Sequence, residues 1–149
     1  MRKIIVLISL SVVMFANDII VKQSNCSVDE TINKLSKIVK SKGLSVFTVV
    51  DHKKNADGVN MKLNESKLII FGNPKVGTAL MQQDITIGLD LPLKVLVYKD
   101  NDSKVKMAYR NGSWIEDRHK LNAPKKVKKI NGAMDKFTTK AGSCGQKTN

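Results

Sequence analysis

The clearest amphipathic pattern in this chain lies between residues 27 and 43. Its apolar positions recur every three to four residues and share one face of a helix: Val28, Ile32, Leu35 and Val39. Ser27 and Glu30 form a capping box, in which the serine accepts from the amide three residues on and the glutamate reaches back. Gly43 suits the left-handed residue that often ends a helix. The pattern predicts a helix over 28–42.

Short β-branched runs predict the strands. Residues 44–50 are almost continuously apolar, which is typical of a strand buried on both faces. Residues 104–109 alternate as a half-buried strand does, and the polar turn at 99–103 predicts that they pair as a hairpin with the run before them. The predicted strands are 19–23, 44–50, 67–71, 91–98 and 104–109.

Start signals place the remaining helices. Asp51 caps a short helical segment over 52–59, and Asn73 followed by Pro74 starts a helix over 74–82. Residues 84–90 are expected to be an irregular or partly extended connection. Ser113 is expected to cap a short helix, and the apolar spacing over 125–139 predicts a final amphipathic helix.

Composition and length favour one domain. The chain has 149 residues, of which 42% are hydrophobic and 5% aromatic, so a core built mainly of valine, isoleucine and leucine is expected. We assign residues 17–140 to a single domain and residues 141–149 to a flexible tail.

The first sixteen residues have the layout of a secretory signal peptide. Arg2 and Lys3 precede an apolar run over 4–15, and Ala16 ends it. The run is shorter than the roughly 20 residues of a spanning helix. Cleavage after Ala16 would release a periplasmic or secreted protein; Met14 is larger than the residue usually found there, which leaves an uncleaved anchor as the alternative. No later run is apolar enough to span a membrane.

The chain is basic, with a net charge of +13 that falls to +11 without the leader. From residue 120 onward, eight lysines face Asp135 alone. Such an end is a solvated face, or a surface for anionic lipid or an acidic protein partner. Nucleic acid is disfavoured, because only Phe137 is interleaved with these lysines and no stacking platform exists.

Two cysteines, Cys26 and Cys144, lie 118 positions apart. In an oxidising compartment they form a disulfide that ties the basic end to the first helix, or they remain free or pair between molecules. Neither belongs to a Cys-x-x-Cys motif, so thioredoxin-type redox catalysis is not indicated.

Several polar residues stand where chemistry is often found. Asp51 and His52 end a strand, and the helix start at Asn73 offers free amides to an anion, although capping explains it equally well. Lys94 among apolar neighbours needs a carboxylate such as Asp90 or Asp51. Met81 belongs to the core or is a soft ligand for copper or haem iron.

Several linked segments resemble one family. They are SVDETINKL, KGLSVFTVVDH, FGNPKVGTALMQ, GLDLPLKVLVY and a final RH, in this order over residues 20–137. The chain resembles the bacterial domain of unknown function 302, which implies a compact α+β domain, an antiparallel sheet with helices packed against it, and often a homodimer. The resemblance places recurrent polar positions on Asp51, His52, Asn73, Thr78, Met81, Asp90, Lys94, Tyr109 and His119.

The chain departs from the family pattern in two places. Residues 64–66 are Asn-Glu-Ser in place of the usual Arg-Pro-Thr, and residues 98–100 are Tyr-Lys-Asp in place of a Trp-Glu-Asp-like segment. Any ligand contact that the family makes through that acidic position is therefore in doubt in this chain.

Three functions remain open from the sequence. The first is an exported, non-catalytic binding module whose pocket gathers the recurrent polar residues around a small ligand, metal or haem. The metal version needs at least two of His52, Met81 and His119 close together. The second is a structural or protein-interaction homodimer without a ligand. The third is a small enzyme that uses His52 with an aspartate and a buried Lys94.

Overall fold

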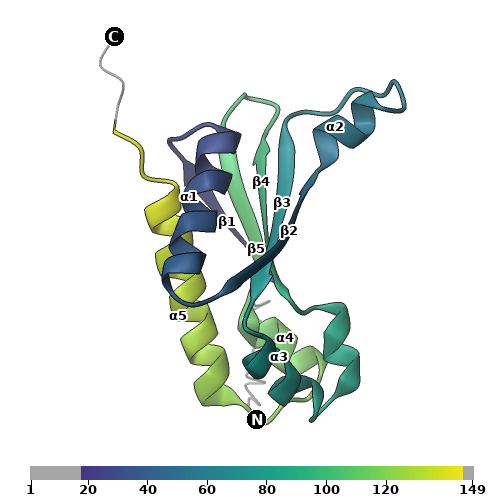
Figure 1. The fold of residues 1–149 in the computed structure, drawn as a ribbon, viewed down its shortest axis with the longest axis vertical. Coiled ribbons are helices and arrows are strands. Elements are labelled where there is room, and N and C mark those ends of the chain that lie inside the picture. The colour runs from purple at the N-terminus through teal and green to yellow at the C-terminus, as the bar shows by residue number, and fades with distance from the viewer. Residues whose placement is uncertain (1–17, 146–149) are drawn as a thin grey trace, which may run out of the picture.

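Five antiparallel strands form one sheet in the computed structural model, which describes residues 18–145 (Figure 1). Their order across the sheet is β1-β5-β4-β3-β2, so the first strand lies at one edge and the second at the other. The strands are β1 (Ile19–Ser24), β2 (Ser45–Asp51), β3 (Ser66–Gly72), β4 (Leu93–Lys99) and β5 (Val105–Arg110). The predicted α+β fold with an antiparallel sheet and packed helices is confirmed.

Two long helices cover one face of this sheet. They are α1 (Val28–Ser41) and α5 (Pro124–Ala141), which lie side by side in Figure 1. Their apolar faces meet alternate residues of the strands, and Leu35, Val39, Ile69, Val95 and Val97 are fully buried between the layers. Aliphatic side chains therefore build most of the core, as the composition predicts.

The capping box of α1 is present with both of its bonds. The Glu30 amide donates to the Ser27 hydroxyl at 3.2 Å, and the Ser27 amide donates to the Glu30 carboxylate at 2.9 Å. The apolar stripe of this helix is buried as its spacing predicts. Gly43 has a positive φ of 71°, which suits a residue without a side chain just past the helix end.

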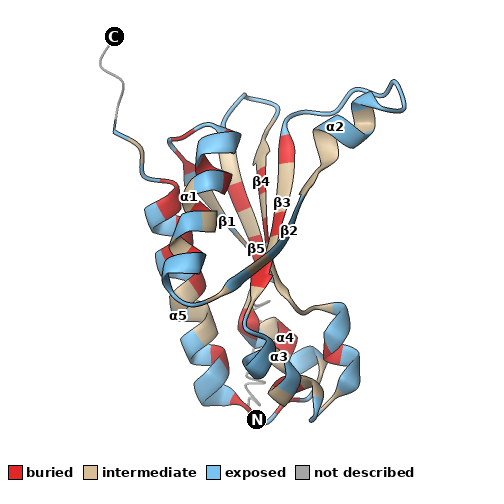
Figure 2. Ribbon diagram, viewed as in Figure 1, coloured by how far each residue is buried: buried red, intermediate tan, exposed pale blue. Residues whose placement is uncertain are grey.

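The prediction that residues 44–50 form a strand buried on both faces is wrong. These residues form β2, but β2 is an edge strand, and Figure 2 colours much of it as exposed. Phe47 is 50% exposed, and a register shift between Val46 and Thr48 marks a bulge. A continuous apolar run does not distinguish a central strand from an apolar edge strand, because the order of the strands depends on pairing between distant segments.

Short helices close one end of the sheet. They are α3 (Pro74–Met81), the 3-10 helix η1 (Ile85–Leu89) and α4 (Gly112–Arg118), and they share a second buried cluster that includes Leu80, Ile87 and Ile115. The connection expected to be irregular or extended is thus a 3-10 helix. The cap of α4 is Asn111, whose side chain accepts from the Ser113 amide at 3.0 Å, and not Ser113 itself.

The chain just after α5 is anchored, so residues 141–144 are not the flexible tail that was predicted for them. Ala141 is fully buried, and the Asn25 amide donates to the Gly142 carbonyl at 2.8 Å. Cys144 is disulfide-bonded to Cys26, with the Cα atoms 5.3 Å apart. The leader over 1–16 and residues 146–149 of the tail lie outside the described residues.

Candidate functional site

The polar residues expected to form one pocket lie at opposite ends of the sheet. Asp51 pairs with Lys67 at the first end of β3, whereas Lys94 pairs with Ile70 near its other end. These two positions are three residues apart along β3, which is about 10 Å at roughly 3.3 Å per residue. Figure 1 shows the same separation, with α2 (His52–Asp57) far from α3 and α4. The predicted convergence therefore fails for Asp51 and His52, while Asp90 contacts both Lys94 and His119 at the other end.

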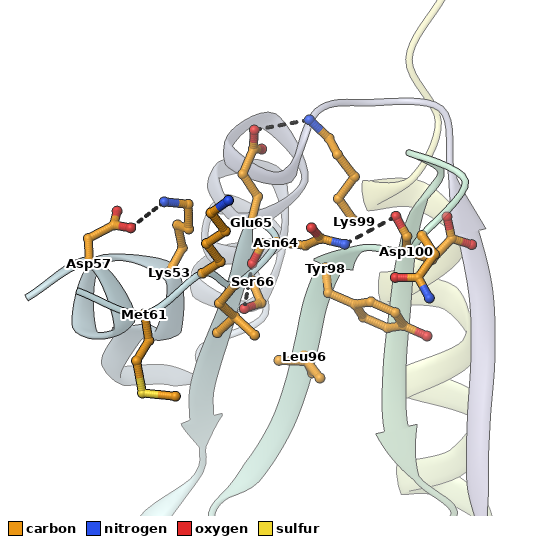
Figure 3. Close-up of a pocket in the computed structure, with 13 residues that line it drawn as sticks. Lys53, Asp57, Met61, Asn64, Glu65, Ser66, Leu96, Tyr98, Lys99 and Asp100 are labelled. Carbon is orange, nitrogen blue, oxygen red and sulfur yellow. Dashed lines mark hydrogen bonds and ion pairs between the residues drawn. The ribbon is translucent and has the colours of Figure 1, made fainter. Parts of the chain in front are cut away.

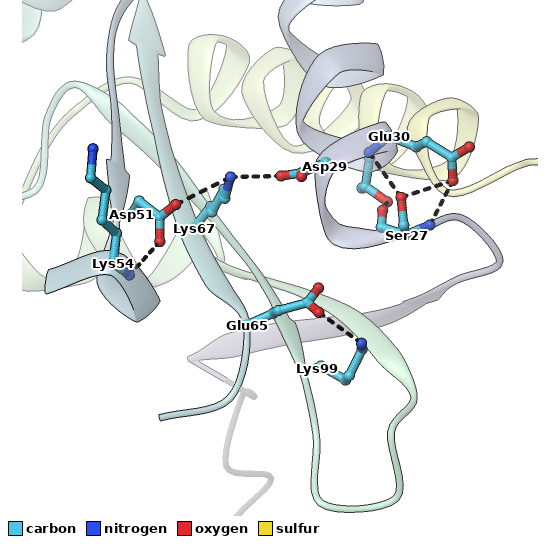
Figure 4. A network of polar contacts seen from close by, with 9 residues as sticks. Ser27, Asp29, Glu30, Asp51, Lys54, Glu65, Lys67 and Lys99 are labelled. Atoms are coloured by element: carbon cyan, nitrogen blue, oxygen red, sulfur yellow. Dashed lines mark hydrogen bonds and ion pairs between the residues drawn. The ribbon is translucent and has the colours of Figure 1, made fainter. Parts of the chain in front are cut away.

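Asp51 belongs to a structural contact at the α2 end. Its carboxylate accepts from the Lys54 amide at 2.9 Å and lies 3.2 Å from the Lys67 ammonium, which also lies 2.6 Å from Asp29 of α1 (Figure 4). The Lys54 amide, followed by Lys67, lowers the pKa of Asp51. Asp29 and Asp51 together raise the pKa of Lys67. This network ties α1, β3 and α2 together.

His119 is held between two carboxylates at the other end. Its Nε2 lies 2.6 Å from Asp90 Oδ2, and its Nδ1 lies 3.1 Å from the Thr86 hydroxyl and 3.4 Å from Asp84 Oδ2. The Thr86 hydroxyl and amide, with His119 behind them, lower the pKa of Asp84. Both ring nitrogens are engaged, so the imidazole has no free nitrogen for a substrate proton.

The proposed metal ligands do not come together. His52 starts α2, Met81 packs beside the second cluster with its sulfur near Gly88, and His119 has carboxylates on opposite sides of its ring. Three side chains placed in this way do not fit a shared metal or haem iron. Within residues 18–145, no group of three or more His, Cys, Asp or Glu side chains is arranged to hold a metal ion.

Three further candidates are also separated. Thr78 is exposed on α3, while Tyr109 is buried in the main core on the helix-covered face of β5. The Asn73 side chain caps α3 by accepting from the Lys75 amide at 2.9 Å. Asn73 thus has the capping role that the sequence left open.

The structure contains a groove that the sequence did not reveal. It measures about 850 Å³ and lies between the arm, which we define as residues 52–65, and strand β4 (Figure 3). Leu96 and Tyr98 line it from β4, and Met61 and Leu63 line it from the arm. Lys99 pairs with Glu65 at 3.0 Å beside it. A volume of this size is typical of ligand pockets.

Both departures from the family pattern line this groove. Residues 64–66 and 98–100 contribute Asn64, Glu65, Ser66, Tyr98, Lys99 and Asp100. The Asn64 side chain donates to the Asp100 carbonyl at 3.4 Å. Segments more than 30 positions apart therefore meet here. The sequence offered one signal for this groove, namely the apolar residues Met61 and Leu63 within an otherwise polar loop.

The sheet face opposite α1 and α5 carries an apolar row. The strand register aligns one residue from each strand across it: Val50, Leu68, Leu96, Ala108 and Val21. Their chain neighbours Ile69, Val95 and Met107 point into the helix-covered core, so the row faces the other way. We call this surface the open face.

The family model for the domain of unknown function DUF302 matches residues 20–137. The chain belongs to this family. The crystal structure of an uncharacterized conserved DUF302 protein from Bacillus stearothermophilus has the same fold, with a TM-score of 0.75 at 16% sequence identity. That match covers 85% of this chain and 99% of the other.

Two curated relatives of this DUF302 chain are longer proteins. Fluoride-specific ion channel FluC 1 of Brucella suis biovar 1 (strain 1330) is 44% identical over 99 residues, which is 66% of this chain and 39% of the relative. Its counterpart in Brucella abortus biovar 1 (strain 9-941) has the same identity over 37% of its length. This chain thus spans less than two fifths of either relative. None of the helices within residues 18–145 combines the length and apolar character that crossing a bilayer requires.

Proposed function

We propose that this DUF302 protein is an exported interaction module that works as a homodimer, with two copies joined through their open faces. The observation that carries the proposal is the apolar row across all five strands, on the side of the sheet opposite α1 and α5. Val21 in this row is 52% exposed. An apolar sheet face of this kind usually packs against another layer.

The surroundings of the row resemble the rim of an interface. Tyr98 and Lys106 flank it on one side, and Lys94 and Arg110 flank it on the other. The Lys106 ammonium lies 2.7 Å from Asp100, and the Arg110 guanidinium stacks 4.3 Å from the Trp114 ring centroid. An apolar centre with a polar rim is the usual anatomy of a protein interface. The Lys106–Asp100 pair also offsets one positive charge of this rim.

The size of the face favours a second copy as its occupant. Five strands about 4.8 Å apart and roughly 20 Å long present about 500 Å² on one face. Two such faces would bury about 1,000 Å², which is the lower bound for a specific interface. The arm adds to this area, because Met61 lines the groove and is 66% exposed. A twofold pairing uses the same surface on both copies.

Export is part of the proposal. The leader over 1–16 supports it, and so does the disulfide between Cys26 and Cys144, since such bonds persist in oxidising compartments. The Brucella relatives support an accessory role, because the similar segment there is part of proteins named fluoride-specific ion channels. The channel activity itself is not carried over to this chain.

The test is the molar mass of the purified mature protein in solution, measured by light scattering across micromolar concentrations. We expect twice the chain mass for the wild type and a single chain mass for Val21→Glu, because a carboxylate in the row opposes its burial. Val76→Glu is the matched control: Val76 is similarly exposed, at 41%, but lies on α3. A monomeric wild type, or a dimeric Val21→Glu variant, would overturn the proposal.

A further inference from the structure

A second, smaller cavity lies where strands β4 and β5 part. Their paired residues run from Lys99 and Val105 to Leu96 and Ala108 and stop there. Continued by two residues, the same register would set Lys94 opposite Arg110. A cavity of about 140 Å³ lies at this position, lined by both of these side chains. It is well above the ~10–15 Å³ that a single water needs.

The lining brings two cations together, and neither forms a direct ion pair. The Lys94 ammonium donates to the carbonyl oxygens of Asp90 at 3.1 Å and Pro92 at 2.9 Å. These bonds use two of its three N–H groups. Within the described chain, neither Lys94 nor Arg110 forms an ion pair with a carboxylate. Like charges opposite each other on adjacent strands are destabilising.

Burial destabilises the charged form of the Lys94 side chain. This loss of hydration lowers the pKa of Lys94, and the charge of Asp90 only partly opposes the shift. The walls beside Lys94 include the apolar side chains of Leu93, Ile115 and Met134. A cation in such surroundings is stabilised by any anion that enters, since the surroundings screen the attraction less than water does.

The charge of the lining sets the charge of the ligand. Asp90 is the acidic member of the lining, and its carboxylate is bound by His119 at 2.6 Å. Lys94 and Arg110 contribute two positive charges and Asp90 one negative charge. One further negative charge therefore balances the lining, while a divalent anion would exceed it.

We infer that the cavity between Lys94 and Arg110 binds a small monovalent anion. Lys94 supplies its remaining N–H group, and the Arg110 guanidinium, whose face rests on Trp114, presents its edge. The apolar walls favour weakly hydrated anions such as nitrate or bromide over strongly hydrated ones. This site needs only one chain, although both cations also flank the apolar row of the open face.

The test is a titration of the mature protein with sodium nitrate, bromide, fluoride and sulfate at constant ionic strength, followed by amide chemical shifts in NMR spectra. We expect saturable shifts around residues 89–94 and 110–115 with nitrate and bromide, and at least tenfold weaker binding in Lys94→Gln and Arg110→Gln. Lys104→Gln, at an exposed lysine of the β4–β5 turn, is the matched control and should bind as the wild type does.

Two further measurements keep the inference falsifiable if a variant folds poorly. Lys94→Arg retains the charge and should retain saturable binding. Crystals grown with bromide should show an anomalous peak between Lys94 and Arg110. Shifts that stay linear with anion concentration, equal binding in Lys94→Gln and the wild type, or an absent bromide peak would each overturn the site. The chain mass measured by light scattering reports separately on the dimer.

Discussion

His119 Nε2 lies 2.6 Å from Asp90 Oδ2, and this contact joins the end of α4 to the residue that follows η1. The His119 side chain is only 7% exposed. The bond therefore fastens the short helices at one end of the sheet to each other, beside the cluster that contains Ile87 and Ile115. Its character is structural, because both ring nitrogens already have partners.

Replacing His119 should destabilise the protein. We expect His119→Ala to lower the free energy of unfolding by about 1.5–3 kcal/mol, the usual range for a hydrogen bond to a charged group. Urea denaturation followed by circular dichroism measures this change. His52→Ala is the matched control, because the His52 side chain forms no hydrogen bond or ion pair within residues 18–145, and it should change stability by less than about 0.5 kcal/mol. Equal effects in the two variants would contradict the structural role of His119.

Stability should fall at acid pH through the carboxylates with lowered pKa values. The pKa values of Asp51, Asp84 and Asp100 all lie below the ordinary value of an aspartate side chain. A carboxylate with a depressed folded-state pKa stabilises the fold above its unfolded pKa, and this contribution is lost as the pH falls through the folded value. We therefore expect the urea concentration at the unfolding midpoint to decrease once the pH falls below about 4.

The variant Asp51→Asn isolates one part of this acid dependence. It removes the titrating group, so its stability should depend less steeply on pH below 4 than that of the wild type, with a modest loss at neutral pH because the Lys67 pair is partly exposed. Asp57→Asn, at an exposed ion pair with Lys53 within α2, is the control. Identical acid profiles for wild type and Asp51→Asn would refute the assignment.

The disulfide should contribute strongly to stability. Cys26 and Cys144 close a loop of 118 positions, which corresponds to roughly 4–5 kcal/mol in the loop-entropy model. We expect the Cys26→Ser and Cys144→Ser double variant to unfold at lower urea, and reducing agent to shift the wild type toward it. Reducing agent should leave the double variant itself unchanged. A wild type insensitive to reduction would show that the bridge does not form in solution.

Export predicts a defined mature mass. Expressed with its leader in a bacterial host, the protein should be recovered from the periplasm or the medium with a mass that starts at Asn17. Intact mass spectrometry checks cleavage and, in the same spectrum, the loss of two hydrogens on disulfide formation. Replacing Arg2 and Lys3 with glutamate is the control and should reduce export. A full-length product in the membrane fraction would favour the uncleaved anchor.

The sequence determined the features that depend on nearby residues. The capping box and stripe of α1, the Asn73 cap of α3 and the β4–β5 hairpin all follow from contacts within a few turns of chain, and all are present. The linked motifs were specific enough to indicate the DUF302 family. These features follow local rules, which a pattern of residues expresses directly.

Only the tertiary structure decided which distant segments meet. Strand order placed the apolar β2 at an edge, separated Asp51 from Asn73, and brought Met61 beside Leu96 in one groove. It also set Lys94 near Arg110 around a cavity. Such neighbours depend on the register of the whole sheet, in which a one-residue slip turns every side chain to the other face. No local pattern records that register, because it results from packing the complete core.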